Sequence, residues 1–233
     1  MVWDLERELP VRVLRAARRR VDAVAFSHDG RWLITAGERE LRVFDDRGAQ
    51  VRALALPPVE ARLVGGRATG TVHAVAFTPG DRHVVVAGDD GLVRQFDAGG
   101  HQVQVWEHPA SILALAVYAD GLVTGSAAGR VSSWRWDGRP LWRSDHDGSV
   151  AHVAVSTDGG LVATAAADCT VRLWDRTGTA TAESPLARRS VGVAFPADGT
   201  GLLTATQVGA LEVWEPATGE ARDDRPVRGR PGE

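Results

Sequence analysis

Several features that would narrow the function are scarce or missing in this chain of 233 residues. It has one cysteine, Cys169, so an internal disulfide is excluded. With no histidine at ligand spacing, we interpret the thiol as a packed side chain and not a metal ligand. No apolar run reaches the roughly 18 to 20 residues of a membrane helix, and residues 1–11 lack the basic start and apolar centre of a secretion signal. We therefore expect no membrane contact and a cytoplasmic location.

An excess of charge of one sign is also lacking. The chain has 27 basic and 30 acidic residues, a formal net charge of −3. This is too close to neutral for phosphate attraction to drive binding, so no nucleic-acid partner is expected. Every basic residue is arginine and asparagine is absent, which favours a GC-rich, bacterial genome. Helix signals are almost absent, because 26 glycines and 11 prolines interrupt any long 3.6-residue pattern. The sequence predicts an all-β protein.

What the chain does contain is a repeat. An aromatic residue closes a short alternating run six times, at intervals of 41, 52, 38, 40 and 40 residues. These residues are Trp3, Phe44, Phe96, Trp134, Trp174 and Trp214. Each complete copy offers three strands separated by turns, and a fourth, half-polar strand follows. Four antiparallel strands at this period match a β-propeller blade. The predicted blades are about 21–56, 71–106, 110–144, 149–185 and 190–215.

The two ends of the chain decide how many blades there are. Residues 216–233 are polar, and we predict a disordered tail there, so the last blade would lack its own outer strand. Residues 5–14 alternate, and Pro10 suits a sheet edge. We predict that this N-terminal strand completes the last blade, which gives about five blades. The alternative is that residues 1–4 are the edge of a missing blade in a longer propeller, and an open blade edge then favours self-association.

The segment "HDGSVAHVAVSTDGGLVATAAADCTVRLWD", residues 146–175, carries a family resemblance. It resembles a Trp-Asp (WD) repeat, and the likeness extends over most of the chain. The resemblance implies a structural hydrogen-bond relay made of His146, Thr164, Asp168 and Trp174. The chemistry is reasonable, because a buried indole N–H needs an acceptor and a carboxylate fixes the histidine tautomer. A catalytic reading of the same histidine, threonine and aspartate is disfavoured, since the hydroxyl would point into a packed sheet.

The other copies depart from this pattern. The third has Ala128 at the acid position and the fifth has Val208. The second has Val86 and Phe96 in place of threonine and tryptophan, and the first has Phe44. Phenylalanine removes the N–H that needed a partner, so we expect one well-connected blade and four looser ones.

The resemblance implies a non-catalytic scaffold that binds a protein or peptide, with no catalytic residues, no metal and no cofactor. The candidate partner-binding rim consists of Arg19, Asp22, Arg39, His73, Asp89 and Gln207. Two alternatives remain: a regulatory or sensor portion of a larger bacterial signalling or defence protein, and a propeller hydrolase with a metal in its channel. For a hydrolase, His73 and His152 are the only candidate ligands on the innermost strands.

Overall fold

The computed structural model describes residues 2–4, 9–12, 20–37, 40–56, 70–186, 190–196, 201–207, 210–215 and 221–226. These residues form strands and turns, with no helix among them, which agrees with the predicted all-β class. In the described part of the chain, no helix is long and apolar enough to cross a membrane. The chain divides into two compact units, Met1–Pro109 and Ala110–Glu233, and each is described by itself.

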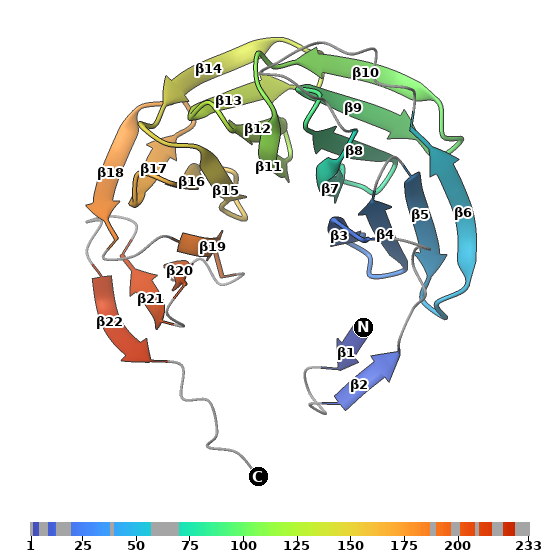
Figure 1. Ribbon diagram of the computed structural model, residues 1–233, viewed down its shortest axis with the longest axis horizontal. Coiled ribbons are helices and arrows are strands. Elements are labelled where there is room, and N and C mark those ends of the chain that lie inside the picture. Colours follow the sequence, from blue (N-terminus) through green and yellow to red (C-terminus); the bar gives the residue numbers. More distant parts are fainter. Residues whose placement is uncertain are drawn as a thin grey trace. The chain divides into compact units, whose positions relative to one another are not determined.

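The first unit contains two four-stranded antiparallel sheets and one two-stranded sheet (Figure 1). The small sheet pairs β1 (Val2–Asp4) with β2 (Leu9–Arg12). The first blade consists of β3 (Ala23–Phe26), β4 (Trp32–Gly37), β5 (Glu40–Asp45) and β6 (Gln50–Ala55). The second blade consists of β7 (Val72–Phe77), β8 (His83–Gly88), β9 (Leu92–Asp97) and β10 (Gln102–Glu107). Strand β7 packs against both β3 and β4.

The second unit contains three four-stranded antiparallel sheets. The third blade consists of β11 (Ile112–Tyr118), β12 (Gly121–Ser126), β13 (Arg130–Arg135) and β14 (Pro140–Asp145). The fourth consists of β15 (Val150–Val155), β16 (Leu161–Ala166), β17 (Thr170–Asp175) and β18 (Ala180–Pro185). The fifth consists of β19 (Ser190–Ala194), β20 (Leu202–Thr206), β21 (Ala210–Trp214) and β22 (Ala221–Pro226). Strand β15 packs against β11 and β12 on one side and β19 on the other.

Burial within a blade follows the strand order. All six residues of β12 are buried, whereas five of the six residues of β6 are exposed. The second strand of a blade is covered on both faces by neighbouring sheets, so it reads as a continuous apolar run. The fourth strand has one face in water and reads as half polar. This difference is the reason the repeat could be recognised from its apolar pattern.

The prediction for the last blade was wrong in one respect. The fourth strand beside β21 is β22, and not the N-terminal segment 5–14; within that segment, β2 pairs with β1 instead. Strand β22 also lies inside the stretch 216–233 that was expected to be a tail. The sequence of β22, "ARDDRP", shows no apolar alternation. An outermost strand can do without it, because backbone groups alone satisfy the pairing to its neighbour.

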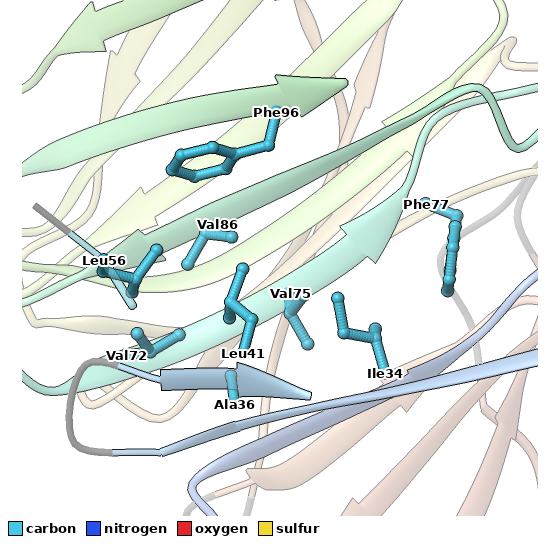
Figure 2. Packing of buried hydrophobic residues seen from close by; sticks show 9 residues of the cluster. All are labelled: Ile34, Ala36, Leu41, Leu56, Val72, Val75, Phe77, Val86 and Phe96. Atoms are coloured by element: carbon cyan, nitrogen blue, oxygen red, sulfur yellow. The ribbon is translucent and has the colours of Figure 1, made fainter. Parts of the chain in front are cut away.

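The core of the first unit lies between its two large blades. Figure 2 shows nine buried side chains of this cluster, contributed by both blades and by Leu56. Phe96 and Phe77 are its aromatic members. The two blades are also joined at a turn, where the carboxylate of Asp81 accepts bonds from the backbone N–H groups of His28, 3.0 Å, and Asp29, 3.1 Å. The Nδ1 of His28 lies 2.8 Å from the same carboxylate.

Candidate functional site

The four predicted relay residues lie together in the fourth blade. The indole Nε1–H of Trp174, on β17, donates to the hydroxyl of Thr164 on β16 across 2.8 Å. The same hydroxyl lies 2.8 Å from Nε2 of His146. On the other side of the ring, Nδ1 of His146 lies 3.1 Å from the Asp168 carboxylate. The hydrogen bonds therefore run unbroken from the interior of the blade to the turn at Asp168.

Burial and hydrogen bonding set the charge state of this relay. Desolvation holds the pKa of His146 below its ordinary value and Arg172 adds to this effect, although the bond to Asp168 opposes it. A neutral ring with its proton on Nδ1 fits every partner, because Nδ1–H then donates to Asp168 and Nε2 accepts from Thr164. Burial alone would raise the pKa of Asp168, but the bonds from Thr170 and His146 outweigh it and lower the pKa. The relay thus pairs a neutral imidazole with a carboxylate.

The turn that carries Asp168 includes one strained residue. The carboxylate of Asp168 accepts hydrogen bonds from the backbone N–H and the hydroxyl of Thr170, at 2.9 and 2.8 Å. The next residue, Cys169, has φ +63°, the left-handed conformation that favours glycine. Glycine stands at the same turn position in the second and third blades, as Gly91 and Gly129. Cys169 is partly buried and its thiol forms no disulfide.

The relay does not supply a nucleophile. The Thr164 side chain belongs to a fully buried residue, and its hydroxyl already contacts Trp174 and His146. The side chain of His146 is 0% exposed. A substrate carbonyl has no room beside this hydroxyl, so the arrangement connects β16, β17 and the turn before β15 and makes the blade rigid.

The other blades keep less of the relay. In the fifth, the indole of Trp214 donates to Thr204 across 2.8 Å. In the third, the corresponding bond from Trp134 to Thr124 is longer, 3.4 Å. The second blade has Phe96 at this position. Its turn acid, Asp90, forms an ion pair with Arg94 at 2.6 Å instead of meeting a histidine.

The predicted rim residues are only partly placed. Arg19 and Arg39 lie outside the described residues, and the contacts of Asp22 include an ion pair with Arg20. Asp89, in the turn between β8 and β9, accepts a bond from the backbone N–H of Gly70 at 3.0 Å, and its own N–H donates to Thr71.

The remaining two rim residues differ in exposure. His73 is half-buried on β7, the strand that follows Thr71, so it lies at the same end of the second blade as Asp89. Gln207 is exposed in the turn after β20, in the second unit. The structure therefore places His73 and Asp89 near one another, and their role in binding stays a prediction. Among the described residues, no group of three histidine, cysteine or carboxylate side chains could hold a metal ion.

Sequence reasoning missed a cavity at the other end of the blades. A hollow of about 320 Å³ opens between the first and second blades. We call it the inter-blade slot. Its lining includes Trp32, Ile34, Leu41, Val43, Arg52, Leu54, Phe77, Val84, Phe96 and Gly100. It lies beside the turns that join the first strand to the second and the third to the fourth. Asp89, the rim residue between β8 and β9, stands at the opposite end of the second blade.

Comparison with known proteins supports the repeat. The family described as "WD domain, G-beta repeat" matches residues 8–45, 60–97 and 138–175. Each matched segment ends on an aromatic–aspartate pair: Phe44–Asp45, Phe96–Asp97 and Trp174–Asp175. The third segment comprises the outer strand β14 of one blade and the three inner strands, β15, β16 and β17, of the next.

Three relatives have related sequences. The chain is 25% identical over 160 residues to the WD repeat-containing protein 26 homolog of Arabidopsis thaliana, with 66% of the chain and 26% of that protein covered. It is 26% identical over 192 residues to the Protein LST8 homolog of Drosophila melanogaster, covering 74% and 58%. It is 30% identical over 161 residues to DNA damage-binding protein 2 of Bos taurus, covering 63% and 38%.

The aligned region thus spans between 26% and 58% of these longer relatives. The periodic aromatic residues and the four-stranded sheets agree with the matched repeats. Three segments of the chain match the WD-repeat family, and the all-β fold of the chain is built from about five four-stranded propeller blades.

Proposed function

We propose that this chain is a non-catalytic scaffold that binds a protein or peptide through the loops of its blades. Membership of a repeat family does not by itself define an activity, because one fold supports many unrelated functions. The observation that carries the proposal is that the side chains of the relay are hydrogen-bonded to one another. The histidine, threonine and aspartate of the relay are largely buried and hydrogen-bonded within the relay, which leaves binding to the exposed turns.

The candidate rim combines groups of different chemistry. Asp89 is acidic, His73 carries an imidazole ring, and Gln207 carries a neutral amide. Such a mixture suits a polar peptide better than a polyanion. The bovine relative is named for binding damaged DNA. For this chain, the net charge of −3 favours a peptide, because phosphate recognition relies on clustered cations.

The proposal can be tested with a random peptide library displayed on phage and selected on the purified chain. We expect a recurrent sequence motif to be enriched. The corresponding synthetic peptide should bind about tenfold more weakly to Asp89→Ala or Gln207→Ala, because a lost hydrogen bond to a ligand costs about 1 kcal/mol or more. Thr181→Ala, at an exposed position on the outer strand β18, serves as the control and should bind normally.

Two outcomes would contradict the proposal. One is a selection that enriches no motif above that of an unrelated bait. The other is tight binding of duplex DNA at about 0.15 M salt, where weak non-specific phosphate contacts are largely screened.

A further inference from the structure

The inter-blade slot has an apolar interior and an open mouth. Ile34, Leu41 and Phe96 line the slot and are 1%, 2% and 3% exposed. Trp32 and Val51, which also line it, are 37% and 50% exposed. In Figure 2, Ile34, Leu41 and Phe96 appear within one apolar cluster of the two blades. A cavity of this size falls at the lower end of the range for pockets that bind small organic groups.

The second unit shows what fills the corresponding space there. Arg52 on β6 stands opposite Val43 on β5, and Trp142 on β14 stands opposite Ser133 on β13. Both pairs lie just beyond the bulge at the blade's aromatic residue, so Arg52 and Trp142 hold the same position in their blades. Trp142 is 9% exposed, which shows that an indole at this position can be buried.

The surroundings of the Trp142 indole match the walls of the slot. It stacks on Trp174 of the next blade, with ring centroids 6.0 Å apart and planes inclined by 29°. By strand register, five residues around Trp142 are each equivalent to a residue that lines the slot. The equivalent positions are Val123 and Ile34, Val131 and Leu41, Val155 and Phe77, Val162 and Val84, and Trp174 and Phe96. The third and fourth blades therefore enclose an indole where the first and second leave a hollow.

A glycine in the neighbouring turn supports this equivalence. A Cβ atom at Gly178, between β17 and β18, would lie 2.6 Å from the Trp142 ring. Gly100 holds the same place between β9 and β10 and also lines the slot. A Cβ there would meet only Leu54, at 3.1 Å. The turn beside the slot thus also carries a glycine, and the side chain nearest to a Cβ there is Leu54 and not an aromatic ring.

Arg52 does not occupy the space because its charge keeps it at the mouth. Its guanidinium donates to the backbone carbonyl of Ala98. A cation held inside an apolar cavity would lose its hydration without compensation, so the side chain extends toward water. The carboxylate of Asp97 also lines the slot. The bonds from the backbone N–H and ring of His101 lower the pKa of Asp97 against a smaller effect of burial, which keeps this carboxylate ionised.

We propose that the inter-blade slot receives an aromatic side chain, best an indole, from a linear segment of a partner protein. This proposal rests on the proposed function only in taking the partner to be a protein, and it assigns a second surface, at the opposite end of the second blade from Asp89. The ring inserts between Phe96 and the apolar side chains of the first blade, as Trp142 does in the second unit. Offset contact between aromatic rings adds to the area that such a ring buries.

The first test uses N-acetyl-tryptophanamide as the probe and N-acetyl-alaninamide as its control, followed by ligand-observed NMR. The unmodified chain should bind the tryptophan probe and not the alanine one. Arg52→Trp should fill the slot and weaken probe binding at least about tenfold, since the ring of the probe is excluded. Arg52→Ala removes the charge and leaves the hollow, so probe affinity should stay within about threefold.

A second variant makes the opposite change, because it removes a ring from the second unit. Trp142→Ala should open an equivalent hollow in the second unit, and added indole should then raise its melting temperature more than that of the unmodified chain, because a ligand that binds only the folded state stabilises it. If Arg52→Trp does not fold, Leu54→Trp takes its place. Leu54 lies two residues further along β6 and also lines the slot, so this variant should likewise weaken probe binding at least about tenfold.

Three results would overturn the proposal: no binding of the tryptophan probe to the unmodified chain, unchanged binding to a folded slot-filling variant, or complete loss of binding in Arg52→Ala. Binding at the rim is judged separately, by whether Asp89→Ala and Gln207→Ala weaken the selected peptide. Unchanged peptide binding in those two variants contradicts the rim proposal and leaves a positive slot result intact, and a negative slot result leaves the rim proposal standing.

Discussion

The second and fourth blades share one strand register and solve the packing of their central aromatic residue in different ways. In the fourth, the tryptophan at 174 has its N–H accepted by Thr164. In the second, the corresponding residues are Phe96 and Val86. A tryptophan beside Val86 would have a buried N–H with no threonine hydroxyl to accept it, and a phenylalanine has none to satisfy. In these two blades the two positions are either both polar or both apolar, whereas the first blade combines a buried threonine, Thr35, with Phe44.

The turn acids follow the same division. Asp168 meets a buried neutral histidine, whereas Asp90 meets Arg94, with side chains 5% and 11% exposed. The arginine of the fourth blade at the position of Arg94 is Arg172, which reaches instead to the Asp145 carbonyl and to Glu183. The second blade, which lacks the relay, thus pairs its turn aspartate with a nearby arginine.

The largest effect is expected from separating the buried ion pair of the second blade. Arg94→Leu leaves Asp90 buried without its cation and should lower the free energy of unfolding by about 3–5 kcal/mol. Urea denaturation followed by circular dichroism measures this change. Arg130→Leu is the matched control, because the Arg130–Asp145 pair is 39% and 59% exposed and should contribute less than about 1 kcal/mol. An equal loss of unfolding free energy in both variants would contradict the expected difference between a buried and an exposed ion pair.

A smaller loss is expected from breaking the relay of the fourth blade. Thr164→Val removes the acceptor of the Trp174 N–H and the partner of His146, so unfolding should become easier by about 2–3 kcal/mol. The reciprocal change, Val86→Thr, places a hydroxyl beside a phenylalanine and should cost about 1 kcal/mol. Adding Phe96→Trp to Val86→Thr should restore part of that loss. No coupling between these two positions in a double-mutant cycle would show that the tryptophan gains nothing from the threonine.

The relay should also make stability depend on pH. Because burial and Arg172 lower the pKa of His146 in the folded chain, the unfolded chain binds a proton first as pH falls below about 6.5. Stability is complete above that pH and declines as pH falls toward the lower folded-state pKa. Melting temperatures between about pH 7.5 and 5 measure the slope. His146→Gln should flatten it, and an equally steep slope in that variant would assign the effect elsewhere.

The smallest effect, and the only stabilising one, is expected at the strained turn. Cys169→Gly removes a side chain from a residue in the left-handed conformation, which relieves roughly 1–2 kcal/mol of backbone strain. Glycine also gives the unfolded chain more conformational entropy, so the net stabilisation should be about 1 kcal/mol or less. The reciprocal change, Gly91→Ala in the second blade, should destabilise. Thermal melting compares the two, and a lower melting temperature for Cys169→Gly would contradict the reading.

The sequence predicted features that depend on residue type and spacing. The aromatic period located the blades, and the relay was assigned from four side chains that the structure brings within hydrogen-bonding distance. Strand β22 was missed because its pairing uses backbone groups, which leave no apolar pattern. The inter-blade slot was missed because it depends on which side chain stands opposite Val43. Only an exact alignment of Arg52 with Trp142 would have revealed it.

The contact between Asp81 and the His28–Asp29 turn has a mechanical consequence. One side chain accepts hydrogen bonds from a neighbouring repeat, so neither blade can shear past the other without breaking them. Repeat proteins gain cooperativity from such neighbour terms. The first two blades should therefore open as a single unit in native-state hydrogen exchange, with amides of β4 and β8 showing matched protection.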